Sequence, residues 1–332
     1  MPEHVFISTT GSGISRASQD LKGRWFVSPL LAGSKFRCLA EDPVNKGVAY
    51  AGSNSIGVLR SNDYGQNWEP IGLEGLAIRA LCVSRTDSNT VYAGTKPPAL
   101  FVTHNGGGKW QEIASFRKMR SFWWFSPAEG RPFTPYIQAI ALSSTDPNLV
   151  VVGIELGSVL RTIDGGKTWE KHRPGALRDC HSLAAHPTNG DWLYEGGGSG
   201  AGAAFSRDGG KTWRQPSIGL DRHYGWAVTA DPARPEIWYA ALSPSAWKAH
   251  SEMNAQACIF RSAGGAAWQK LAGGLPETLN AMPYALLNDP ASPGHVYAGL
   301  ANGDVWFSAD YGDTWELLPF NLGSIQRSLI RL

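Results

Sequence analysis

Thr162-Ile163-Asp164-Gly165-Gly166-Lys167-Thr168-Trp169 is the clearest copy of an eight-residue phrase that recurs along the chain. Ser206-Arg207-Asp208-Gly209-Gly210-Lys211-Thr212-Trp213 is almost the same text. Five further copies, three close and two degenerate, end at Trp68, Trp110, Trp315, Trp25 and Trp268. Successive tryptophans are 42 to 59 residues apart, so the chain is a repeat protein with seven units.

Each residue type of the phrase has a physical role in a tight strand-turn-strand connection. An Asp or Asn at the tip accepts hydrogen bonds from backbone amides that the turn leaves unpaired. Glycine adopts the positive φ that other residues resist. The Trp opens the next strand and can bury its ring between stacked sheets. The carboxylates of these turns are therefore interpreted as turn acceptors and not as catalytic groups.

Every unit carries three more strand signals. An apolar strand ends in a turn such as Asp146-Pro147, a β-rich strand such as Val91-Tyr92-Ala93-Gly94 follows, and a third strand leads into the phrase. Four strands per unit predict a propeller blade. Residues 1–332 are therefore predicted to form one all-β, seven-bladed β-propeller. The first unit lacks its innermost strand, and Ser324–Arg331 is predicted to supply it, which closes the ring and removes exposed sheet edges.

The eight-residue phrase resembles the Asp-box, or BNR, repeat of sialidases and related β-propellers, and the resemblance covers the whole chain. In that family the repeat marks the fold. Sialidases add an arginine triad, a Tyr/Glu nucleophile pair, an acidic Asp and an Arg-Ile-Pro motif on six blades. This chain has no Arg-Ile-Pro motif and seven predicted blades, so sialidase activity is not expected.

Composition excludes several classes of protein. Charged residues make up 17% of the chain and the net charge is +2, so the sequence lacks the excess of positive charge that indicates a nucleic-acid partner. No apolar run is long enough to span a membrane. The first residues lack the pattern of a signal peptide, and the four cysteines show no Cys-x-x-Cys spacing, so a cytoplasmic location is expected.

One residue per unit is predicted to lie where the innermost strand begins and to face the axis of the ring. Aligning the units on their Asp-Pro turns gives Arg37, Arg79, Gln138, His181, Trp226 and Tyr284, with Gln326 or Arg327 from the closing strand. Convergent polar side chains at a pocket mouth indicate a binding site. The alternative is that these groups only contact water in the channel.

Two insertions, about 116–136 and 243–257, are predicted on the same face of the ring. They contain Trp123, Trp124 and Trp247, with charged residues between them. Long loops on a rigid scaffold often carry function, so these loops are predicted to wall the channel mouth. The alternatives are a contact between subunits or a plug that fills space.

Other candidates come from the same face. His181, His223, Tyr284 and Glu195 are the predicted catalytic groups, because histidine and carboxylate side chains can transfer protons near neutral pH. Glu155, Tyr224 and the axial residues are predicted to bind substrate. His181, His223 and Glu195 could also form an open divalent-metal site, although their spacing is not a metal signature. No other cofactor is indicated.

Two functions fit these features. The first is a hydrolase or lyase, glycosidase-like, that binds a small polar or carbohydrate-like substrate at the channel mouth, with Arg37 and Arg79 holding an anionic or carbonyl group. The second is a non-catalytic scaffold that docks a protein through its aromatic loops. The resemblance allows both, since Asp-box propellers include xyloglucan-cleaving glycosidases, which pair two seven-bladed rings, and a photosystem assembly factor.

Overall fold

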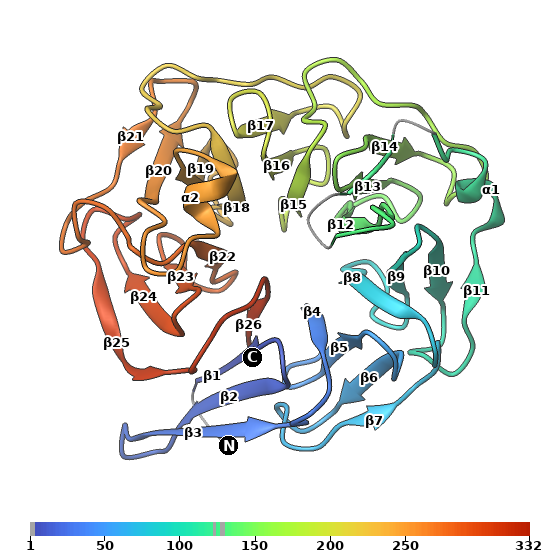
Figure 1. Cartoon of the computed structure of the whole chain (residues 1–332), viewed down its shortest axis with the longest axis horizontal. Helices are drawn as coiled ribbons and strands as arrows, with labels where there is room; N and C mark the ends of the chain where they lie inside the picture. The colour runs from blue at the N-terminus through green and yellow to red at the C-terminus, as the bar shows by residue number, and fades with distance from the viewer. Residues whose placement is uncertain (1–3, 122–123, 127–129) are drawn as a thin grey trace.

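The computed structural model describes residues 4–121, 124–126 and 130–332. Seven antiparallel sheets stand in a ring around one axis (Figure 1), which confirms the predicted seven-bladed β-propeller. The innermost strands of blades 1 to 7 are β26 (Leu329–Arg331), β4 (Phe36–Glu41), β8 (Ala77–Val83), β12 (Ile137–Leu142), β15 (Cys180–Ala185), β18 (Tyr224–Ala230) and β22 (Pro283–Asn288).

Two further strands follow in each blade. The second strands are β1 (Val5–Thr9), β5 (Ala49–Ser53), β9 (Val91–Lys96), β13 (Val150–Ile154), β16 (Leu193–Gly197), β19 (Ile237–Ser243) and β23 (Val296–Leu300). The third strands are β2 (Ile14–Gln19), β6 (Val58–Ser61), β10 (Leu100–Thr103), β14 (Val159–Thr162), β17 (Ala203–Ser206), β20 (Cys258–Ala263) and β24 (Asp304–Ser308).

The outermost strands are β3 (Trp25–Leu30), β7 (Glu69–Pro70), β11 (Gln111–Glu112), β21 (Gln269–Lys270) and β25 (Glu316–Asn321). In blades 4 and 5 the outermost position is reduced to one bridge each, Arg161 with Glu170 and Phe205 with Arg214. Two four-residue helices, α1 (Ala114–Arg117) and α2 (Ala246–Ala249), complete the elements. Within the described ranges, no helix has the length and apolar character needed to cross a membrane.

The eight-residue phrase forms the turn between the third and outermost strands. In blade 4 the Thr162 hydroxyl donates to Asp164 Oδ1 at 2.8 Å and accepts from the Gly166 amide at 3.0 Å. Asp164 Oδ1 also accepts from the Thr168 amide at 2.9 Å, and Gly166 has φ 87°. The carboxylate therefore satisfies turn donors, as the sequence predicts.

Blade 1 departs from this turn. Lys22 stands where the other copies have glycine, and it is exposed. The Ser18 hydroxyl accepts from Arg16 at 2.9 Å, and the β2–β3 pairing continues as far as Gln19 opposite Trp25. Asp20 still accepts from the Lys22 and Arg24 amides, both at 2.9 Å, and Gly23 has a φ of 78°, so blade 1 keeps the turn acceptor with its glycine one residue later.

The C-terminal strand closes the ring. Strand β26 pairs antiparallel with β1, with Phe6 opposite Arg331 and Ser8 opposite Leu329. Figure 1 places both chain ends in this blade. The predicted closure is confirmed, although the strand itself covers only the last three residues of the predicted segment.

Glycines of the second strands allow adjacent blades to approach each other. A Cβ atom at Gly153 in blade 4 would lie 2.2 Å from the Cys180 Sγ atom of blade 5. A Cβ atom at Gly94 in blade 3 would lie 2.4 Å from the side chain of Ile137 in blade 4. The Tyr-Ala-Gly pattern therefore reflects the space that the next innermost strand requires.

Candidate functional site

Six of the innermost strands share an irregularity near the start of their pairing with the second strand of the blade. In each of β4, β8, β12, β15, β18 and β22 the register with the second strand shifts by a β-bulge. The residues skipped by the shifts are Arg37, Arg79, Gln138, His181, Trp226 with Ala227, and Tyr284. A bulge leaves its residue out of the ladder and re-aims its side chain. The six positions predicted from the Asp-Pro alignment are therefore the bulge positions.

Five of the predicted residues line one cavity on the axis of the ring. Its volume is about 170 Å³. Its guanidinium, amide and imidazole side chains come from four innermost strands and from the segment before β26, and they are Arg37, Arg79, Gln138, His181 and Arg327, with Ser182 and Ser328 adding two hydroxyl groups. Three guanidinium groups and an imidazole thus face one small space. No Asp or Glu belongs to the described lining of this cavity.

Arg327 is held in a strained conformation. Its φ is 82°, in the left-handed region that disfavours residues with a Cβ atom. Its guanidinium lies 4.8 Å from the Trp226 ring centroid. Its Nη1 atom is buried and has no hydrogen-bond partner within the described ranges. A strained, cationic side chain with an unsatisfied donor is typical of a site that awaits a ligand.

His181 is fixed by three neighbours. Its Nδ1 atom lies 2.7 Å from the Gly225 carbonyl oxygen, which can only accept, so Nδ1 carries a proton. Its Nε2 atom lies 3.5 Å from the Tyr224 hydroxyl and 3.4 Å from Asp179 Oδ1. Nε2 can therefore accept a proton, and Asp179 can stabilise the charged ring that results.

Asp179 stays ionised despite being largely buried. Burial alone would raise its pKa, but the hydrogen bond and charge of His181 and the Leu156 amide together hold that pKa below its usual value. The carboxylate is thus available to a protonated His181.

A chain of aromatic groups continues from His181 into the second insertion. The Tyr224 hydroxyl lies 3.0 Å from His250 Nε2, and His250 Nδ1 lies 2.9 Å from the Tyr284 hydroxyl. Burial, and then the charges of Arg327 and His181, lower the pKa of His250 to about 4, so this imidazole is neutral at pH 7. A neutral imidazole between two hydroxyls can pass a proton along the chain.

A second hydrogen-bonded pair lies in the same region. The Tyr136 hydroxyl donates to Glu155, and the Ser126 hydroxyl donates to the other carboxylate oxygen at 3.3 Å. Burial, and then the Glu155 charge, raise the pKa of Tyr136. Its ring lies 5.4 Å from the Arg79 guanidinium carbon. Glu155 is a predicted residue, whereas its partner Tyr136 was missed.

Trp226 is occupied by protein groups. His181 stacks on its ring at 4.3 Å, and Tyr284 approaches edge-on at 4.9 Å. With Arg327 also over the ring, Trp226 is buried. The predicted substrate-stacking residue therefore orients His181 and Arg327 in this structure.

Glu195 and His223 lie apart from the cavity. Glu195 is fully buried in blade 5, its Oε2 accepts from the Leu177 amide at 2.9 Å, and burial raises its pKa well above the usual value. His223 is exposed. Among the described residues no three His, Cys, Asp or Glu side chains are arranged to hold a metal ion. The metal hypothesis for His181, His223 and Glu195 therefore receives no support from their placement.

The predicted loop aromatics have different environments. Trp124 is buried, and its Nε1 donates to the Ser158 hydroxyl at 3.1 Å, so this ring is part of the core. Trp247 on α2 is 83% exposed. Trp123 lies outside the described residues.

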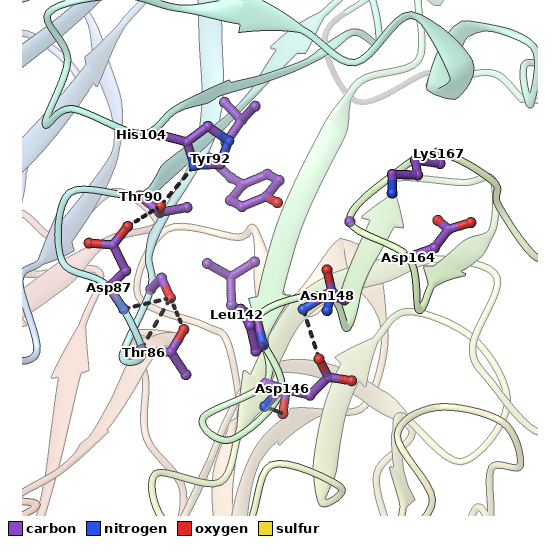
Figure 2. A pocket seen from close by; sticks show the side chains of 15 residues that line it. Thr86, Asp87, Thr90, Tyr92, His104, Leu142, Asp146, Asn148, Asp164 and Lys167 are labelled. Atoms are coloured by element: carbon purple, nitrogen blue, oxygen red, sulfur yellow. Dashed lines mark hydrogen bonds between the residues drawn. The ribbon is translucent and has the colours of Figure 1, made fainter.

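A separate groove of about 390 Å³ runs between blades 3 and 4, on the face of the eight-residue turns (Figure 2). Its polar groups bond to other groups of their own blade. Thr90 Oγ1 donates to Asp87 at 2.7 Å and lies 2.9 Å from His104 Nδ1, and Asp146 accepts from the Asn148 amide at 2.9 Å. These groups are satisfied as turn acceptors, and we assign them no ligand.

Comparison with known proteins finds likeness in fold. No family model matches the chain, and no curated protein matches it. Among solved structures, a GH74 xyloglucanase from Xanthomonas campestris aligns with a TM-score of 0.70 at 18% identity, over 98% of this chain and 53% of that chain. An ancestral GH74 enzyme gives a TM-score of 0.64 at 18% identity, over 93% of this chain and 39% of that chain.

The solved neighbours also include a protein-binding propeller. YCF48 bound to D1 peptide aligns with a TM-score of 0.56 at 16% identity, over 86% of this chain and 82% of that chain. The chain therefore spans about half or less of the two GH74 chains and most of the YCF48 chain. At these identities the likeness shows the fold alone.

Proposed function

We propose that the axial cavity binds a small anionic substrate and that the protein is a hydrolase or lyase acting on it. The observation that carries this proposal is the convergence of the Arg37, Arg79 and Arg327 side chains on one cavity beside His181. Guanidinium groups bind carboxylates and phosphates with two parallel hydrogen bonds, and are stronger at this task than neutral donors.

The roles follow from the geometry. The three arginines hold the anionic group of the substrate. His181 Nε2 accepts or returns a proton at the bond that is cleaved, and Asp179, 3.4 Å away, stabilises the imidazolium. The chain from Tyr224 through His250 to Tyr284 connects this proton to the second insertion. Tyr136 and Glu155 supply a second acid-base pair in the same region.

The fold supports an enzyme. Two neighbours are described as a GH74 enzyme and a GH74 xyloglucanase, so a fold like that of this chain occurs within longer glycoside hydrolase chains. A carbohydrate-like substrate stays a prediction of the sequence; the proposal itself requires only the anionic group, and we interpret the eight-residue repeat as an Asp box.

A docking scaffold is the second candidate. Trp247 is 83% exposed on α2, beside the site, where a partner protein could bury it. One YCF48 neighbour is described as bound to D1 peptide. In this case the aromatic loop, and not the axial cavity, would carry the function.

Binding and turnover test the enzyme proposal separately. Calorimetry with organic acids, sugar acids and inorganic phosphate should find a ligand for which Arg327→Met lowers affinity about tenfold to hundredfold, the loss expected for a charge-assisted hydrogen bond. Arg173→Met is the matched control. Arg173 does not line the cavity, and its guanidinium forms an ion pair with Glu170 at a distance of 2.8 Å. His181→Asn should keep the ligand but lose turnover of its esters, glycosides or elimination substrates.

Two results would contradict the proposal. One is that no acid in the panel binds more tightly to the parent than to Arg327→Met. The other is that His181→Asn turns over every substrate at the parental rate, which would leave binding without catalysis and favour the scaffold.

A further inference from the structure

We infer that the ligand of the axial cavity is an acid with a linear apolar body, which extends along the axis of the ring below the arginines. This inference rests on the proposed anion-binding function and names its ligand class. It concerns the part of the ligand that the guanidinium groups do not touch.

The wall of the channel changes character below the arginines. Leu39, Leu81 and Leu183 line the arginine cavity and also a second cavity of about 260 Å³, so the two spaces adjoin. The second cavity is lined mainly by aliphatic side chains, among them Val83, Leu142, Leu287 and Ile330. A ligand that enters between the arginines therefore meets an apolar tube.

The path has a defined length. On β4, Arg37 lines the upper cavity, Leu39 lines both, and Glu41 lines the lower one. Strands rise about 3.3 Å per residue, so the four steps from Arg37 to Glu41 span roughly 13 Å. This length suits an extended alkyl chain with its carboxylate at the upper end.

The orientation follows from the charges at the two ends. Three guanidinium groups face the upper cavity. The lower cavity ends at Glu41 and Arg85. Burial raises the pKa of Glu41 to about 7, while Arg85 and Arg331 oppose that shift, so the lower end carries at most the one positive charge of Arg85 against three guanidinium groups at the upper end. The carboxylate of a ligand is thus drawn to the upper end.

A sugar acid would fit this tube poorly. Its hydroxyl groups would lose water and find no partners beside Leu39, Leu81 and Leu183. Each methylene buried in the same place increases affinity, by about fourfold. The wall therefore selects an alkyl chain over a polyol of the same length.

Calorimetry on the full chain with acetate, hexanoate, octanoate, decanoate and glucuronate tests the inference. Affinity should rise about fourfold per methylene until the tube is filled, and glucuronate should bind more weakly than hexanoate. Leu183→Asn should remove the dependence on chain length while acetate binds as in the parent. Arg327→Met should weaken every acid.

The outcomes separate the two claims. Equal affinity from acetate to decanoate, or tighter binding of glucuronate than of hexanoate, would overturn the apolar body and leave the anion site standing. Failure of all the acids to bind would contradict the proposed function, and with it the inference. If Leu183→Asn unfolds, as thermal melting would show, Leu287→Asn serves for the same comparison with the longer acids, because Leu287 lines the lower cavity and is only half-buried.

Discussion

The short strand β26, Leu329–Arg331, closes the ring, and the substitution Leu329→Ala tests this closure. Leu329 is 3% exposed and packs with Phe6 and Ile325 in the cluster between blades 1 and 7. Truncating a buried leucine costs about 3 kcal/mol, from lost transfer energy and the cavity that remains. For 332 residues an unfolding entropy of about 2.1 cal/mol/K per residue converts this into a fall in Tm of roughly 4 °C.

Leu317→Ala is the matched control. Leu317 lies in β25 of the neighbouring blade and is 48% exposed, so its truncation should cost less than about 0.5 kcal/mol. Differential scanning calorimetry measures both changes, and hydrogen exchange should show faster opening of the β1 amides only in Leu329→Ala. Equal melting temperatures for the two variants would refute closure by β26.

Three further changes address packing, pH and the turns. Gly153→Ala should destabilise the protein by about 1–3 kcal/mol in urea titration, because its Cβ would lie 2.2 Å from Cys180 Sγ; an unchanged midpoint would contradict the close approach of blades 4 and 5. Since burial lowers the pKa of His250 from 6.5 to about 4, its neutral form contributes stability above pH 6.5 that is lost as the pH falls towards 4. His250→Phe should therefore show a smaller fall in Tm across that window, and equal slopes would show that His250 is not held neutral. Asp208→Ala should cost about 1 kcal/mol, because the Thr212 amide loses its acceptor at 2.8 Å, yet leave ligand affinity and turnover unchanged; lost turnover would show that the turn carboxylates act in catalysis.

The sequence predicts the ring and its axial residues for a physical reason. In blades 2 to 7 the turn after the innermost strand begins with a side chain that accepts a backbone amide two residues later, so counting back five residues from it reaches the same structural position; these turn residues are Asp42, Ser84, Ser143, His186, Asp231 and Asp289. The innermost strands of blades 2 to 7 each have a β-bulge at that position. The register is therefore preserved from blade to blade, and Arg37, Arg79, Gln138 and His181 meet at one cavity.

The sequence does not predict how the insertions fold back. His250 and Tyr136 lie in or at the end of these insertions, whose paths no repeat constrains. Their hydrogen bonds to Tyr284 and Glu155 depend on side-chain directions that a pattern of residue types cannot give. The residue that follows α2 and the residue two positions before Gln138 could have been flagged only by their place on the mouth face.

Residue type alone also misjudges exposure. The alignment of the units predicts that Trp226 binds substrate, and Glu195 is predicted to be catalytic because a carboxylate can transfer protons. The structure covers the Trp226 ring with His181 and Arg327, and it encloses Glu195 within blade 5, where its carboxyl accepts from Leu177. Whether a side chain has a free face depends on neighbours that lie far away in the chain, 18 residues for Leu177 and Glu195 and about a hundred for Arg327 and Trp226.

The bulges separate the residues that make the fold from those that can make a site. A residue in the ladder must match its neighbours in both strands, whereas a bulged residue is released from that pairing. The side chain at this position can therefore vary without altering the sheets: it is arginine in blades 2 and 3 and glutamine, histidine, tryptophan and tyrosine in blades 4 to 7. Blade 1 places a side chain in the cavity without a bulge. Arg327, which precedes β26, has a left-handed backbone conformation and lines the cavity. A ring that keeps its turns and varies these positions retains its fold while its chemistry changes. An identity of 18% to a GH74 xyloglucanase therefore accompanies a shared fold, and the ligand has to be determined from the axial side chains.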